Sequence, residues 1–105
     1  PNPVLSYIIG TGSQRQAWFE YMKDMMKDKT NEQAAIVMAA FVKCGILHAP
    51  SFPDTEKSFG GIGNRKSYNP SFGYYLNLDI ESDACLQNLC DQINYRKQRI
   101  IKEIE

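Results

Sequence analysis

The sequence has almost none of the residues from which a metal or catalytic centre is usually built. It contains one histidine and three cysteines, and no two cysteines form a C-x-x-C pair. A single histidine cannot supply a two-histidine metal site, and no cluster of aspartates and glutamates has the spacing of metal ligands. We therefore expect no metal site, no cofactor and no enzymatic activity.

The pair closest to a catalytic one is Cys44 with His48, on either side of Gly45. A nucleophilic cysteine with its base would still need an orienting acid. Because Cys44 follows a long apolar run, we interpret it as an inert core thiol. The remaining enzymatic alternatives depend on this pair or on the terminal amine of Pro1.

Net charge is also lacking, and so is any hydrophobic run of membrane length. Twelve basic residues balance twelve acidic ones, which removes the strong positive field of a general nucleic-acid binder but leaves local patches open. No stretch reaches the roughly 18 apolar residues that a membrane span needs. An odd number of unpaired cysteines is typical of a reducing compartment. We expect one cytoplasmic domain over residues 1–105 and no membrane association.

Two helices are the best-supported elements. Nine consecutive apolar residues, Ala34 to Val42, cannot be amphipathic and predict a helix that is buried on all sides, with Gly45 just beyond its end. Before them, an apolar stripe at helical spacing predicts a first helix that begins after a Ser13 cap and contains Trp18, Met22, Met25 and Met26. The short link between the two helices predicts a packed pair.

Two further segments favour strands. Val4 to Ile9 is a short apolar run that ends at a glycine, and residues 72–80 alternate, with Tyr74, Leu76, Leu78 and Ile80 on one face. A third strand could lie near Ile46. Residues 48–71 are rich in proline and glycine and predict a long loop. With a last helix capped by Ser82, the predicted fold is α+β and helix-dominated, a helical pair plus a C-terminal helix with a small antiparallel sheet.

The last helix offers a candidate protein-contact surface. Its residues Leu86, Cys90, Ile93, Lys97, Ile100 and Ile104 follow a 4-3-4-3-4 spacing. Ile100, Ile101 and Ile104 would be costly to leave in water, because burying such a side chain is worth roughly 1.5–3 kcal/mol. They could contact a protein partner, a second copy of the chain, or their own domain. Tyr68 in the predicted loop and Phe72 at the start of the predicted strand are two further contact candidates.

Cations suggest an alternative function in nucleic-acid binding. The candidate residues form two sets, Lys57, Arg65 and Lys66 near the predicted loop and Arg96, Lys97, Arg99 and Lys102 in the last helix. The segments "AAFVKCGIL" and "FGYYLNLD", with a basic tip between them, resemble the recognition helix and wing of winged-helix DNA-binding proteins. That resemblance implies base contacts from the helix, yet the helix offers mainly Gln33 and Lys43 for them.

We therefore expect a small non-catalytic accessory protein that acts through protein–protein contacts and could self-associate. A nucleic-acid-binding module of winged-helix-like character is the alternative. No motif in the sequence identifies the partner.

Overall fold

The computed structural model describes the backbone of residues 2–104 and the side chains of residues 2–101. The chain forms helices and 3-10 turns in the order η1 (Pro3–Tyr7), α1 (Gly12–Met26), α2 (Asn31–Lys43), α3 (Phe52–Phe59), α4 (Arg65–Asn77), η2 (Ile80–Ser82) and α5 (Ala84–Ile104). The predicted small antiparallel sheet is wrong, because residues 2–104 contain no strand longer than one isolated bridge. The fold is helical.

The predicted N-terminal strand is a 3-10 turn followed by that single bridge. Pro3 is the first residue of η1, where its fixed φ suits a helical turn and its missing N–H is not needed. Beyond η1, Ile8 pairs with Leu47, and the Ile9 N–H donates to the Ile46 carbonyl at 2.9 Å. The chain therefore does run antiparallel to residues 46–48, but over too short a length to form a sheet.

The predicted loop over residues 48–71 and the predicted strand over residues 72–80 are also wrong, since together they contain the whole of α3 and α4. Each of these helices has its own cap: the Ser51 side chain accepts a hydrogen bond from the Asp54 N–H, and the Asn64 side chain accepts one from the Ser67 N–H. Helix α4 contains Pro70, which cannot donate the usual backbone hydrogen bond. The wing of the winged-helix resemblance is therefore absent, because its segments are helical.

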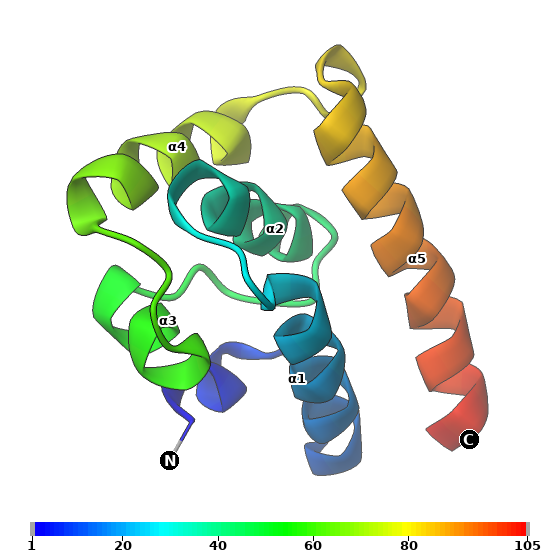
Figure 1. The fold of residues 1–105 in the computed structure, drawn as a ribbon. Coiled ribbons are helices and arrows are strands. Elements are labelled where there is room, and N and C mark those ends of the chain that lie inside the picture. Colours follow the sequence, from blue (N-terminus) through cyan, green and yellow to red (C-terminus); the bar gives the residue numbers. More distant parts are fainter. Residues whose placement is uncertain (1, 105) are drawn as a thin grey trace.

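Helix α2 is buried on all sides, as predicted. It occupies the centre of the molecule, with α4 packed across it and with α1 and α5 on its other faces (Figure 1). Every residue from Ala34 to Phe41 is buried. Its small alanines let neighbouring helices approach closely, and the Phe41 ring meets Trp18 and Tyr21 of α1 edge-on, at 6.1 and 5.8 Å between ring centroids.

The turn between α3 and α4 holds the start of α2. The Asn31 N–H donates to the Ile62 carbonyl at 2.7 Å, and the Asn31 side chain accepts from the Asn64 N–H at 3.0 Å. Gly63 has a φ of +97°, and a Cβ at this position would collide with the Asn31 side chain. Gly63 thus allows the turn to approach α2 closely.

Helix α1 is capped by Thr11, two residues before the predicted Ser13 cap. Thr11 and Gln14 form a reciprocal capping box, in which each side chain accepts from the backbone N–H of the other. The predicted apolar stripe is buried at Trp18, Met22 and Met26. The predicted first helix is therefore confirmed, but its cap is Thr11 rather than Ser13.

Helix α5 lies beside α1 at one edge of the molecule and runs in the opposite direction (Figure 1). Its cap is Asp83 rather than Ser82, because the Asp83 carboxylate accepts the Leu86 N–H at 2.9 Å. Its buried residues share one stripe: Leu86, Cys90, Ile93 and Ile100. The rest of the helix faces solvent or the edge of α1.

Candidate functional site

The predicted contact residues of the last helix have different environments. The Ile100 side chain is 2% exposed and belongs to the core of the domain. Its neighbour Ile101 is 41% exposed. The side chains of Lys102 and Ile104 lie outside the described residues. Among these candidates, Ile101 alone has a described side chain that reaches solvent.

The predicted contact aromatics of the former loop pack within the domain. Tyr68 is fully buried, and burial raises the pKa of its hydroxyl. Phe72 is half-buried and stacks on the Tyr68 ring at 5.6 Å between centroids. A partner could reach the edge of Phe72 but not Tyr68.

The two predicted basic sets lie on different sides of the molecule. Lys57 in the last turn of α3 and Lys66 in the first turn of α4 are both exposed, and the Arg65 guanidinium lies 5.6 Å from the centroid of the Phe52 ring. Helix α3 and the start of α4 lie across α2 from α5 (Figure 1). The cations of α3 and α4 therefore do not form one continuous surface with those of α5.

A groove of about 410 Å³ lies where α1 and α5 run side by side, and it brings two of the predicted cations together with aromatic rings. We call it the α1–α5 groove. Its lining consists of Tyr21 from α1 and, from α5, Asp91, Gln92, Tyr95, Arg96 and Arg99. The α5 residues recur at intervals of three and four, so they form one face of that helix.

The floor of the groove is a stacked pair. The Arg96 guanidinium lies 5.2 Å from the centroid of the Tyr21 ring, a cation–π distance. Tyr21 is held from behind, because its ring meets Trp18 and Phe41 edge-on. Burial raises the pKa of Tyr21, and the positive charge of Arg96 acts in the opposite direction. The Arg96 Nε is covered and has no hydrogen-bond partner.

The rim of the groove is Tyr95 and Arg99, one turn apart on α5. Tyr95 is 64% exposed, the highest value among the exposed large hydrophobic side chains of the described chain. Arg99 is exposed at the end of the groove farther from Asp91. Tyrosine and arginine are the residue types, with tryptophan, that contribute most energy at protein interfaces.

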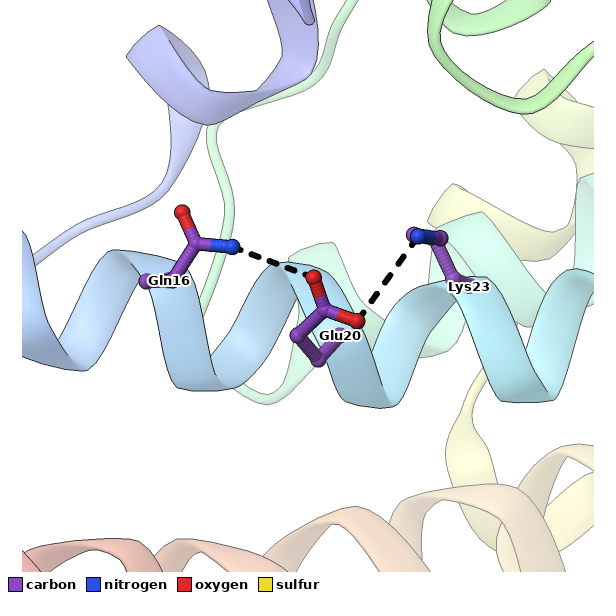
Figure 2. Close-up of polar contacts among 3 residues, drawn as sticks. All are labelled: Gln16, Glu20 and Lys23. Atoms are coloured by element: carbon purple, nitrogen blue, oxygen red, sulfur yellow. Dashed lines mark hydrogen bonds and ion pairs between the residues drawn. The ribbon is translucent and has the colours of Figure 1, made fainter.

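Two charged side chains of α1, Glu20 and Lys23, pair with each other outside the groove. The Glu20 carboxylate accepts a hydrogen bond from Gln16 Nε2 at 3.1 Å with one oxygen, and its other oxygen lies 3.7 Å from Lys23 Nζ. Figure 2 shows these three side chains on the side of α1 away from α5. The charge of the groove is therefore set by α5.

Two other hollows are lined by charged side chains. One of about 370 Å³ at the start of α2 contains Glu32, which accepts the Tyr75 hydroxyl at 2.8 Å. One of about 470 Å³ at the ends of α1 and α3 is lined by three lysines, which complement the partial negative charge of helix C-termini, together with Asp24 and Asp28.

The half-buried thiol of Cys44 is a poor nucleophile at neutral pH. Burial, followed by the neighbouring Cys90, raises the pKa of Cys44 to about 12. Its Sγ lies 3.8 Å from the Cys90 carbonyl oxygen. Among the described residues, no group of three or more histidine, cysteine, aspartate or glutamate side chains could hold a metal ion.

Sequence reasoning identified Arg96 and Arg99 but missed Tyr21, Tyr95, Asp91 and Gln92. The spacing of the α5 residues could have indicated a shared face. Nothing in the sequence could have placed Tyr21 opposite them, since Arg96 comes 75 positions after it in the chain.

Comparison with known proteins adds no relative. No protein-family model, curated protein or solved structure is significantly similar to this chain. Within the described residues, no helix is both long enough and apolar enough to cross a membrane.

Proposed function

We propose that this chain is a non-catalytic protein-interaction module that holds its partner in the α1–α5 groove. The observation that supports the proposal is an exposed Tyr95 beside a Tyr21–Arg96 stack, in a concave surface of about 410 Å³. Interface hot spots combine tyrosine and arginine anchors with pockets that exclude water. The three free thiols suit a reducing compartment, and we propose a cytoplasmic location.

The groove is also preorganised for binding. Tyr21 cannot turn freely, because two aromatic rings contact it and a guanidinium covers its face. A rigid anchor loses little conformational entropy when a partner binds, so more of the contact energy appears as affinity.

Selection from a displayed library of random peptides on the immobilised protein tests the proposal. We expect binders whose affinity falls at least tenfold on Tyr95→Ala. Tyr74→Ala on α4 is the matched control, because Tyr74 is 60% exposed and lies outside the groove. Binders that are equally sensitive to both changes, or to neither, would contradict the proposed site.

Nucleic-acid binding is the second candidate function, although the wing that the winged-helix resemblance implied is absent. The observation that favours it is three cations within four residues of α5, Arg96, Lys97 and Arg99, among the amide side chains of Gln92 and Gln98. Release of counterions from three phosphates predicts a log–log salt slope of roughly −3 on duplex DNA. Fluorescence anisotropy of a labelled duplex across salt concentrations measures it, and absence of binding at low salt would exclude this function.

A further inference from the structure

We propose that the partner presents an acidic amphipathic helix, which lies along the α1–α5 groove with its carboxylates at the Arg96–Arg99 end. This inference depends on the proposed function, since it names the chemistry of the partner for the same groove.

The charge of the groove is polarised along its length. Its lining contains two guanidinium groups, Arg96 and Arg99, and one carboxylate, Asp91. Asp91 precedes both arginines on α5, and no other acid lies between Asp91 and Arg99. Complementary potentials favour a partner with carboxylates at the arginine end and disfavour a basic one.

The distance between these charges predicts how far apart the complementary charges of the partner helix should be. Asp91 and Arg99 are eight residues apart on one helix, which is about 12 Å at 1.5 Å per residue. A second helix spans that distance in about two turns. We therefore expect an acidic residue in the partner and, about seven or eight positions away on the same face, a basic or amide residue that meets Asp91.

The shape of the groove favours a helix as the occupant. It lies between two helices that run side by side in opposite directions (Figure 1). A third helix can place large side chains at i, i+3 and i+4 into such a groove. The exposed ring of Tyr95 offers the apolar contact, so the residues between the partner's charges should be leucine, methionine or aromatic.

The opposite flank of α5 provides an internal control. At about 100° per residue, Lys97 lies about 160° and Ile101 about 200° around the helix from Arg99. Lys97 is exposed and is absent from the groove lining. Lys97→Glu makes the same change in charge as Arg99→Glu, outside the proposed contact.

The decisive experiment repeats the peptide selection on the wild-type protein, on Arg99→Glu and on Lys97→Glu. The wild type and Lys97→Glu should enrich peptides that carry Asp or Glu beside Leu, Met or aromatic residues. Individual binders, measured by fluorescence anisotropy, should lose at least tenfold in affinity on Arg99→Glu and less than threefold on Lys97→Glu. Arg99→Gln, which removes the charge without reversing it, should give an intermediate loss.

The outcomes separate this inference from the proposed function. Peptides that need Tyr95 for binding but contain no acidic residue would contradict the acidic helix. So would peptides whose affinity does not change on Arg99→Glu. In both cases the groove would still be a protein-binding site. If no binder depends on Tyr95, both fail. A concentration-dependent mass in light scattering that Arg99→Glu abolishes would identify a second copy as the occupant. Duplex DNA binding that Arg99→Glu abolishes would identify a nucleic acid instead. Either result would overturn the inference.

Discussion

Helices α2 and α5 bury apolar side chains in opposite ways. Helix α2 is covered from Ala34 to Phe41 on every face. Helix α5 is longer, but it buries a single stripe and presents the remaining faces to solvent. A helix enclosed by its neighbours has no surface left for a partner, whereas one at the edge of the fold can stabilise the domain and bind at once.

Helices α2 and α5 also contact the same ring, Tyr21, from different sides. Phe41 of α2 contacts Trp18 and Tyr21 within the core. Arg96 of α5 covers the outer face of the same Tyr21 ring. Tyr21 therefore connects the interior to the groove, and changes on its two sides should affect different properties: stability from α2, and binding from α5.

The largest expected effect is on α2. Phe41→Ala should lower the free energy of unfolding by about 3–5 kcal/mol, because it removes a fully buried ring and leaves a cavity. Denaturant unfolding followed by circular dichroism measures the loss. Tyr74→Ala, at a position 60% exposed, should cost about 0.5 kcal/mol or less. Equal losses would show that α2 is not the enclosed helix described here.

Two neighbouring isoleucines test which stripe of α5 is buried. Ile100→Ala should destabilise the protein by about 2–4 kcal/mol, since this side chain is 2% exposed. Ile101→Ala should cost less than about 1 kcal/mol, because Ile101 is 41% exposed. Thermal and denaturant unfolding of the two variants measure the contrast. The reverse order would mean that α5 is rotated about its axis.

A hydrogen bond between α4 and α2 should make stability depend on pH. Tyr75→Phe removes the hydroxyl that donates to Glu32 and should cost about 1–2 kcal/mol at pH 7. That hydrogen bond, followed by burial, raises the pKa of Tyr75 from 10.0 to about 12. Above pH 10 the unfolded chain loses this proton first, so the contribution is complete below pH 10 and is lost as the pH rises to 12.

Urea unfolding of the wild type and Tyr75→Phe between pH 7 and pH 12 measures this dependence. The stability difference between the two proteins should shrink across the upper part of that range. Tyr74→Phe is the control, because Tyr74 is exposed. A difference that is constant up to pH 12 would contradict the hydrogen bond.

The smallest expected effect compares how α5 and α2 begin. Asp83→Ala should cost about 1 kcal/mol, because the carboxylate caps α5 through the Leu86 N–H. Thr30→Ala should cost only a few tenths, since the Thr30 side chain makes no cap hydrogen bond at the start of α2. Denaturation midpoints compare the two variants. A larger loss for Thr30→Ala would indicate that α2 depends on its cap more than on its packing.

The sequence predicted α2 well because a nine-residue apolar run leaves few alternatives. It failed at residues 72–80, where two patterns overlap. Tyr74, Leu76 and Leu78 alternate as in a strand, while Tyr68, Phe72 and Tyr75 follow helical spacing. Pro70 weighed against the helix, but the helix tolerates it, and packing against α2 favours the second pattern.

The sequence predicted the two arginines of the candidate site but not the aromatic residue that α1 contributes. The positive charge of Arg96 and Arg99 is visible in the sequence, and so is the helix that contains them. Their value as a binding surface depends on Tyr21, which α1 brings beneath Arg96. A second basic set on α3 and α4 looked equivalent in the sequence, yet it lies across α2 from α5.

By itself, the sequence determined which segment would be enclosed and which would remain amphipathic, because hydrophobic periodicity acts locally along the chain. Only the tertiary structure decided that Val4–Ile9 pairs through a single bridge, that residues 65–77 form a helix, and that Tyr21 and Arg96 stack. Those outcomes depend on contacts between residues that are far apart in the sequence. The free energy of such long-range contacts exceeds the small local preferences that a short segment carries.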